Sequence, residues 1–195
     1  MTVLAVDITT AYGSLALARD GQLLEEFLLN APAGYGEIIF TAIDGLLKCH
    51  ALTVAAIDLF AAASGPGTFT GVRMGLTVVQ GLAEALGKPV CGISNLKALA
   101  HTGSGPLRRP VLDARRGEYY TAAYDSAGHL IEPERLQKLE SLEEFLQQTG
   151  PLAAAIAAIA RTEPAQDPAP LEANYIRRSD AELNLTVRLP SPLRM

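Results

Sequence analysis

Short apolar runs alternate with longer stretches whose apolar residues recur every three or four positions through the first hundred residues of the chain. A continuous apolar run predicts a buried strand, and helical spacing predicts an amphipathic helix. Strands are predicted over residues 3–6, 14–18, 23–29, 59–63 and 90–93. Helices are predicted over residues 35–49, 72–86 and 95–100. The resulting order, β-β-β-α-β-α-β-α, indicates a mixed sheet covered by helices.

Local signals mark the ends of several of these elements. Asp20-Gly21 is a favoured two-residue hairpin turn between the second and third strands. Gly87 is typical of a residue that ends a helix, and Ser94 is typical of a helix N-cap. Thr53 is expected to cap a short turn that runs to residue 57.

The second half of the sequence has a weaker pattern. Residues 101–110 (HTGSGPLRRP) are rich in turn formers, so the chain is expected to divide into a lobe of residues 1–100 and a smaller lobe of residues 101–195. The smaller lobe is expected to hold strands over 111–113 and 118–124, helices over 142–148 and 152–160, and an exposed Pro-rich linker over 163–170.

Length and composition allow a sizeable core, because the chain has 195 residues, of which 49% are hydrophobic. The formal net charge is −5, so the molecule as a whole has no electrostatic reason to coat nucleic acid or a membrane. Residues 97–116 are the exception, with five basic side chains against one acidic side chain. Four of the basic residues are candidates for contact with an anionic partner, the alternative being a solvated loop: Arg108, Arg109, Arg115 and Arg116.

The cysteines and histidines disfavour several chemistries. Cys49 and Cys91 each lie at the edge of an apolar segment and form no disulfide framework, which favours a reduced, cytoplasmic protein. No apolar stretch is long enough to span a bilayer, and no leader segment is expected. His50, His101 and His129 share no helix face, and the sequence has no Cys-x-x-Cys. No metal site is therefore expected.

A glycine-rich corner, SGPGTFTGVRMG over residues 64–75, joins a predicted strand to a predicted helix. A Walker A loop would need Lys followed by Ser or Thr after the last glycine, but Val72-Arg73 follows Gly71. A dinucleotide loop would need an acidic residue after the next strand, and none follows residue 93. Both phosphate-binding interpretations are therefore disfavoured.

The remaining interpretation is a bare corner that lets a partner approach the backbone. Arg73 supports it, because a cation in the first turn of a helix opposes the helix dipole at a cost of roughly 0.3–1 kcal/mol, which an anionic partner would offset. The alternatives are that Arg73 points into water and that Phe69 is a core plug rather than an exposed hot spot. The predicted interface consists of Ser64, Gly65, Pro66, Gly67, Thr68, Phe69, Thr70, Gly71, Arg73 and Gly75.

A second constellation follows the first strand. Asp7, Thr9 and Thr10 are candidates for clamping the phosphates of a nucleotide, and the alternative is that they only cap the turn. Ser64 follows a strand, but its surroundings lack the Gly-x-Ser-x-Gly pattern of a nucleophile elbow. No catalytic residue is assigned.

Four stretches, in this order, resemble TsaB (YeaZ-type) proteins: LAVDITTAYGSLAL, SGPGTFTGVRMGLTVVQGLAEALGKPV, VLDARRGEYYTAAY and NYIRRSDAE. That family belongs to the actin- and sugar-kinase-like ATPase superfamily. The resemblance implies a two-lobed α/β protein with a ribonuclease H-like fold, in which the second lobe of this chain is reduced.

The resemblance also implies a function. TsaB proteins are non-catalytic subunits needed for threonylcarbamoyladenosine at position 37 of tRNAs that read codons beginning with A, and they pair with the catalytic paralogue TsaD and with the ATPase TsaE. It follows that tRNA is met only through the complex and that the isolated chain forms a homodimer. The paralogue holds its metal with a His-x-x-x-His pair, and residues 35–40 of this chain contain no histidine. No cofactor is expected, apart from vestigial nucleotide binding at residues 7–10.

Two other classes of function are alternatives. One is an enzyme acting by itself, either an ATP-dependent phosphotransferase or a metallopeptidase-like hydrolase that uses Asp7. The other is a tRNA-binding module built on the four arginines. Hydrolysis of ATP by the purified chain would favour the first, and a salt-dependent affinity for tRNA that falls when the arginines are removed would favour the second.

Overall fold

A five-stranded sheet forms the centre of the first lobe in the computed structural model, which describes residues 1–31 and 34–176. Its strands are β1 (Thr2–Asp7), β2 (Ser14–Arg19), β3 (Gln22–Leu28), β4 (Leu59–Gly65) and β5 (Val90–Ser94). They lie in the order β3-β2-β1-β4-β5, with β1, β2 and β3 antiparallel and with β4 and β5 parallel to β1. All five predicted strands are present, and the predicted hairpin turn places Asp20 and Gly21 in the left-handed region, at φ 51° and 87°.

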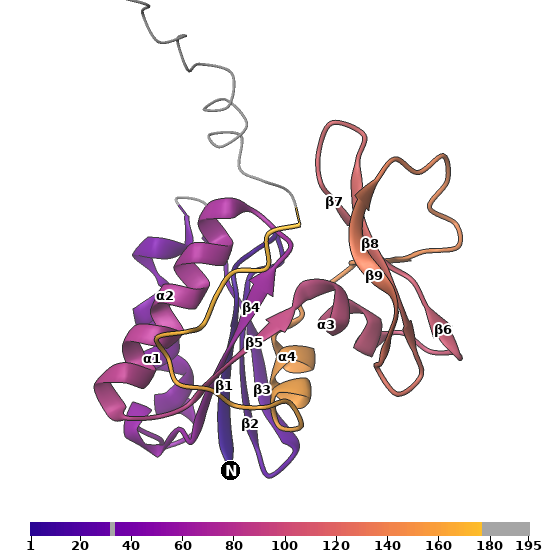
Figure 1. Ribbon diagram of the computed structural model, residues 1–195. Coiled ribbons are helices and arrows are strands. Elements are labelled where there is room, and N and C mark those ends of the chain that lie inside the picture. Colours follow the sequence, from indigo (N-terminus) through magenta and orange to yellow (C-terminus); the bar gives the residue numbers. More distant parts are fainter. Residues whose placement is uncertain (32–33, 177–195) are drawn as a thin grey trace, which may run out of the picture.

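Helices cover both faces of this sheet (Figure 1). α1 (Ile39–Cys49) and α2 (Phe69–Leu86) pack on one face, and α3 (Asn95–Thr102) and α4 (Ala153–Ala160) pack on the other. Successive side chains of a strand point to opposite faces, so Leu4 and Val6 join the core under α1 and α2 whereas Val3 and Ala5 join the core under α4. The central strand β1 is therefore buried on both sides, which explains its continuous apolar run.

The ends of two helices follow the predicted signals. Gly87 ends α2 in the left-handed region at φ 60°, and the Ser94 hydroxyl caps α3 by accepting hydrogen bonds from two backbone amides. α2 begins earlier than predicted, because the Thr68 hydroxyl accepts a hydrogen bond from Gly71 N at 3.3 Å and caps the first turn.

The region between β3 and β4 differs slightly from the prediction. The predicted helix over 35–49 is divided into a 3-10 turn, η1 (Tyr35–Glu37), and the helix α1. The predicted short turn is present as η2 (Val54–Ala56), but the side chain of Thr53 makes no capping hydrogen bond there.

The second lobe is built on another sheet. Its strands are β6 (Leu107–Arg108), β7 (Pro110–Asp113), β8 (Tyr119–Asp125), β9 (Leu130–Gln137) and β10 (Leu146–Gln147). Four of them lie in the order β10-β7-β8-β6, and β9 also pairs with β8. The predicted strands over 111–113 and 118–124 are confirmed as β7 and β8. Three strands, β6, β9 and β10, were not predicted.

The predicted helix over 142–148 is wrong. Apolar residues recur there at helical spacing, but the chain forms β10, which pairs in parallel with β7. Leu146 N of β10 donates a hydrogen bond to the carbonyl of Arg109, just before β7, at 2.8 Å. β9 was not predicted because it contains Pro133, which argues against a strand, and because its apolar residues do not alternate. The β8–β9 register shifts beside that proline, between residues 121 and 124.

α4 lies against the first sheet, although its position in the sequence placed it in the smaller lobe. Its N-terminal amides are satisfied by first-lobe side chains, since Ala153 N donates to Ser14 Oγ at 3.3 Å and Ala154 N donates to Glu26 Oε1 at 2.8 Å. The division at residue 100 stays a prediction, but α4 packs with the first lobe.

Residues 161–176, which we call the strap, cross the first lobe after α4 (Figure 1). Gln166 and Val90 exchange backbone hydrogen bonds of 2.9 Å, so the strap covers the outer edge of β5. Gln80 of α2 donates to the carbonyls of Pro168 and Leu171, and Leu171 is buried. Residues 163–170 are mostly exposed, as predicted, but the segment is tied to β5 and α2 through Gln166 and Pro168.

Two glycines of α2 allow a matched test of how closely the start of this helix packs on Ile8. A Cβ at Gly71 would lie inside contact distance of the Ile8 carbonyl and 2.6 Å from Thr68 Oγ1, whereas a Cβ at Gly81 would meet nothing within 4 Å. Gly71→Ala should lower the free energy of unfolding by about 3 kcal/mol or more. Gly81→Ala should raise it by about 0.5–1 kcal/mol, because alanine favours helix. Urea unfolding measures both, and equal effects would contradict the close approach at Gly71.

Candidate functional site

The glycine-rich corner joins β4 to α2, and its ten predicted interface residues differ in exposure. Five are buried, namely Ser64, Gly65, Pro66, Gly71 and Gly75, and Gly67 is half-buried. Four are exposed, namely Thr68, Phe69, Thr70 and Arg73. Only these four present side chains that a partner can reach directly.

The glycines are bare because the chain itself approaches them. A Cβ at Gly67 would lie 2.6 Å from Thr9 Cβ, and Gly71 packs on the Ile8 carbonyl in the same way. Gly65, at φ 104°, packs below the carbonyl of Asn174 in the strap. The close approach that the sequence suggested for a partner is thus made by the β1–β2 turn and the strap. A bulky residue at Gly71 would therefore disturb the fold before any interface.

Beside the corner, α1 and α2 enclose a groove of about 500 Å³. Its floor is apolar and its rim carries Phe40 of α1, which is 58% exposed, and Phe69 of α2, which is 45% exposed. Phe69 is therefore not a core plug. Exposed large apolar side chains that gather around a groove mark an interaction surface.

Asp7 lies at the end of β1 and is fully buried. Its Oδ1 accepts hydrogen bonds from Thr9 N at 2.9 Å and from Thr9 Oγ1 at 2.6 Å, and Thr9 Oγ1 in turn accepts from Asn95 Nδ2 at 2.7 Å. Asn95 Oδ1 accepts from Gly65 N at 3.0 Å. This chain of hydrogen bonds links β1, α3 and the end of β4.

Burial raises the pKa of Asp7 above 3.8, and the hydrogen bonds from Thr9 oppose that rise in part. Its Oδ2 has no hydrogen-bond partner among the described residues. The carboxyl group is sealed from solvent, and Thr9 is engaged with it. Asp7 and Thr9 therefore brace the turn, and of the predicted phosphate-clamping residues Thr9 and Thr10 both line the cleft described next.

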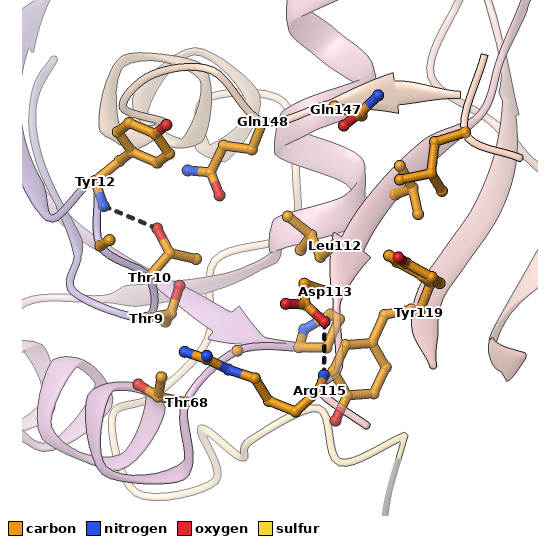
Figure 2. A pocket seen from close by; sticks show the side chains of 16 residues that line it. Thr9, Thr10, Tyr12, Thr68, Leu112, Asp113, Arg115, Tyr119, Gln147 and Gln148 are labelled. Atoms are coloured by element: carbon orange, nitrogen blue, oxygen red, sulfur yellow. Dashed lines mark hydrogen bonds between the residues drawn. The ribbon is translucent and has the colours of Figure 1, made fainter. Parts of the chain in front are cut away.

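A cleft of about 440 Å³ lies between the two lobes (Figure 2). The β1–β2 turn and the glycine-rich corner line one side, and β7, the start of β8 and Gln147–Gln148 line the other. Arg115 reaches across it toward Thr9 and Thr68 (Figure 2), and its backbone amide donates to Asp113 Oδ1 at 2.7 Å. Arg115 and Arg116 are both left-handed, at φ 66° and 59°, a conformation that is costly for residues with a Cβ.

The four candidate arginines do not form one patch. In the strand register, Arg108 lies opposite Tyr124 of β8. Asp113, two residues before Arg115, lies opposite Tyr119 at the other end of β8. Five residues of strand separate these ends, which is roughly 17 Å. Arg108 Nη1 donates to the Ala100 carbonyl at 3.3 Å.

Arg109 is also engaged within the chain, because it lies 3.7 Å from a Glu132 carboxylate oxygen and 3.8 Å from a Glu144 carboxylate oxygen. Arg115 is the member of the four that reaches the cleft (Figure 2), and Arg116 follows it in the same turn. Contact of all four with one anion stays a prediction without support from their placement.

Glu134 of β9 is a residue that the sequence did not bring to notice. Its Oε1 accepts hydrogen bonds from Ser94 Oγ and from Tyr124 OH, the latter at 2.7 Å, and its Oε2 accepts from Asn174 Nδ2 at 2.6 Å. One carboxylate thus ties the second lobe to the cap of α3 and to the strap. Burial and this carboxylate raise the pKa of Tyr124. Glu134 lies in an unpredicted strand, so no local signal could find it.

In the part of the chain that the structure describes, no group of three or more His, Cys, Asp or Glu side chains is placed to hold a metal ion. None of the helices formed by residues 1–31 and 34–176 is long and apolar enough to cross a membrane.

The strand order β3-β2-β1-β4-β5, with helices on both faces and a glycine-rich corner before α2, defines an α/β protein of the actin-like, ribonuclease H-like class. The family model described as TsaD, tRNA N6-adenosine threonylcarbamoyltransferase, matches residues 31–181. YeaZ from Pseudomonas aeruginosa superposes with a TM-score of 0.77 at 25% identity, over 89% of this chain and 99% of that chain. The chain belongs to the TsaB (YeaZ-type) family of this superfamily.

Two curated relatives carry the name tRNA threonylcarbamoyladenosine biosynthesis protein TsaB. The Escherichia coli protein is 35% identical over 156 residues, which is 76% of this chain and 67% of that protein. The Bacillus subtilis protein is 32% identical over 134 residues, which is 68% of this chain and 58% of that protein. The chain thus spans about three fifths to two thirds of the length of these relatives.

The buried carboxyl group generates a test by pH. A raised pKa means that folding favours the protonated form, so the contribution of Asp7 to the free energy of unfolding falls as the pH rises above 3.8. Asp7→Asn removes this ionisation and should make the protein more stable than the wild type at pH 7, with the difference disappearing below pH 3.8. Chemical unfolding across this range measures it.

Asp20→Asn is the control of opposite sign. The N-terminal ammonium group lowers the pKa of the exposed Asp20, so its ionised form adds stability above pH 3.8 and that stability is lost as the pH falls. Asp20→Asn should therefore lower the stability at pH 7. If Asp7→Asn also lowers it, the carboxylate is held ionised and the account of Asp7 is wrong.

Proposed function

We propose that this chain is a non-catalytic partner subunit in the modification that adds a threonylcarbamoyl group to N6 of adenosine 37 in tRNAs reading codons that begin with A. Its partner would be a TsaD-type catalytic paralogue, with TsaE as a further member of the assembly. The names of the Escherichia coli and Bacillus subtilis relatives support this role, and so does the match to the TsaD family model.

The groove between α1 and α2 is the observation that carries the proposal. These helices lie on the same face of the first sheet (Figure 1). The aromatic rings of Phe40 and Phe69 are exposed at the rim of the groove between them. Aromatic side chains around a concave apolar surface are the usual anchors of a protein interface. A partner helix that fills the groove would bury them.

The chemistry of the first lobe favours an accessory role over an enzyme. Asp7, which the enzymatic alternatives need at the cleft, is sealed and hydrogen-bonded within the chain. The segment from Tyr35 to Cys49 contains no histidine where the catalytic paralogue carries its metal-binding pair. We therefore propose that the reaction takes place on the partner, and that nucleotide binding by this chain is at most vestigial.

Binding of tRNA is proposed to take place only through the complex. The net charge of −5 disfavours an independent tRNA-binding surface, and the candidate arginines lie at opposite ends of β8. In isolation the same helical face is proposed to pair with a second copy of the chain, because an isologous contact would bury it.

The proposal is tested with one charge placed on each of two equally exposed apolar residues. Phe40→Asp should weaken binding to the TsaD-family subunit of the same organism by at least about tenfold, because it puts a carboxylate into an apolar groove. Ile131→Asp is the control, since Ile131 is 57% exposed on β9, away from the groove. Isothermal titration calorimetry gives both affinities, and threonylcarbamoyladenosine in cells that depend on each variant gives the functional consequence.

The competing outcome is also measurable. Wild-type chain that fails to bind the subunit, yet hydrolyses ATP by itself with loss of activity in Asp7→Asn, would favour the phosphotransferase alternative.

A further inference from the structure

We infer that Arg73 is a pre-oriented cation that recognises an aspartate or glutamate side chain of the partner subunit, at the edge of the α1–α2 groove. This inference rests on the proposed function and adds the chemistry by which the partner is selected.

The side chain of Arg73 is held in one orientation. Its Nε donates a hydrogen bond to the hydroxyl of Tyr175 at 2.9 Å, and its guanidinium carbon lies 4.0 Å from the centre of the Phe69 ring. Phe69 and Tyr175 stack on each other with their centres 5.8 Å apart and their planes at 26°. Two aromatic rings from distant parts of the sequence therefore fix one arginine, and little side-chain freedom remains to be lost on binding.

The positive charge of Arg73 has no carboxylate partner within the described chain. Among residues 1–31 and 34–176, no carboxylate lies within ion-pair distance of Arg73, and its two Nη groups donate no hydrogen bond. The first turn of α2 contains no acidic residue, so the positive end of the helix dipole adds to the field. The two Nη groups form a donor fork, which matches the two oxygens of a carboxylate.

The surroundings of Arg73 favour a protein carboxylate over a nucleic-acid phosphate. Arg73 itself lines the groove, whose other walls include Phe40, Met74 and Val78. An amphipathic helix can fill such a groove and present an acidic side chain at its edge, whereas a sugar–phosphate backbone has no apolar surface to offer. The occupant is thus a helical segment of the partner, with Asp or Glu beside its apolar residues.

The strap and the second lobe position this arginine. Tyr175 follows Asn174, whose backbone amide donates to the Ser64 carbonyl at 2.7 Å and whose side chain donates to Glu134. The stacked cluster therefore combines the start of α2 with the end of the strap. A second copy of the chain is the less suitable occupant, because an isologous contact brings two Arg73 side chains to one interface.

The test compares two arginines in binding of the full chain to the TsaD-family subunit, at low and at high salt. Arg73→Gln should weaken binding by at least about tenfold at low salt and flatten its salt dependence, because an ion pair is lost. Arg19→Gln is the matched control, since Arg19 is exposed at the end of β2 remote from the glycine-rich corner, and it should change neither quantity. Tyr175→Phe keeps the ring but removes the hydroxyl, and should cause a smaller loss.

Charge reversal identifies the partner's residue. Arg73→Glu should weaken binding by about a hundredfold, since it sets like charges together. The acidic residues that the partner places at the groove are then replaced with Arg, one at a time. One of these replacements should raise the affinity for Arg73→Glu by at least about tenfold.

The outcomes separate this inference from the proposed function. If the wild type binds, Phe40→Asp fails to bind and Arg73→Gln binds with unchanged affinity and salt dependence, the role of Arg73 is wrong while the proposed function stands. If Arg73→Gln weakens only self-association in sedimentation velocity, the occupant is a second copy and the inference is wrong. If the wild type does not bind the subunit at all, the proposed function itself fails.

Discussion

The structure depends on the contact between the turn after β1 and the corner before α2. Ile8 and Thr9 lie directly against Gly71 and Gly67, at a distance that leaves no room for a side chain. The same turn is tied by Asp7 and Thr9 to Asn95, and through Asn95 to the amide of Gly65. Close packing and buried hydrogen bonds thus converge on one point, where the first strand, the fourth strand and two helices meet.

This contact determines where the exposed groups of α2 stand. Because the buried face of the helix start is fixed on Ile8, the opposite face places Phe69 and Arg73 toward solvent beside the groove with α1. The strap reaches the same place from the other side and brings Tyr175 onto both residues. This surface is therefore made from segments about a hundred residues apart in the sequence.

The sequence predicted the elements whose signals are local. Gly87 and Ser94 mark helix ends through their own conformations and hydrogen bonds, and the apolar run of β1 reports its burial on both faces. What could not be predicted depends on distant partners. β10 forms because it can pair with the edge of β7. α4 packs on the first sheet, where Ser14 and Glu26 accept hydrogen bonds from its backbone amides. β9 contains Pro133, which argues against a strand in the sequence. The glycines of the corner were recognised as bare, but which atoms approach them was not visible in the pattern.

The two charged residues that the sequence singled out, Asp7 and Arg73, differ in their exposure to solvent. The acid at the end of β1 is withdrawn from solvent and holds a turn together, and its raised pKa reflects the cost of that burial. Arg73, at the start of α2, is exposed and is oriented by two aromatic rings. It has no carboxylate partner within the described chain. A buried acid is unavailable to a phosphate or a metal ion, whereas a fixed, exposed cation beside an apolar groove is available to another protein. The same corner therefore both supports the fold and presents an exposed cation beside the groove.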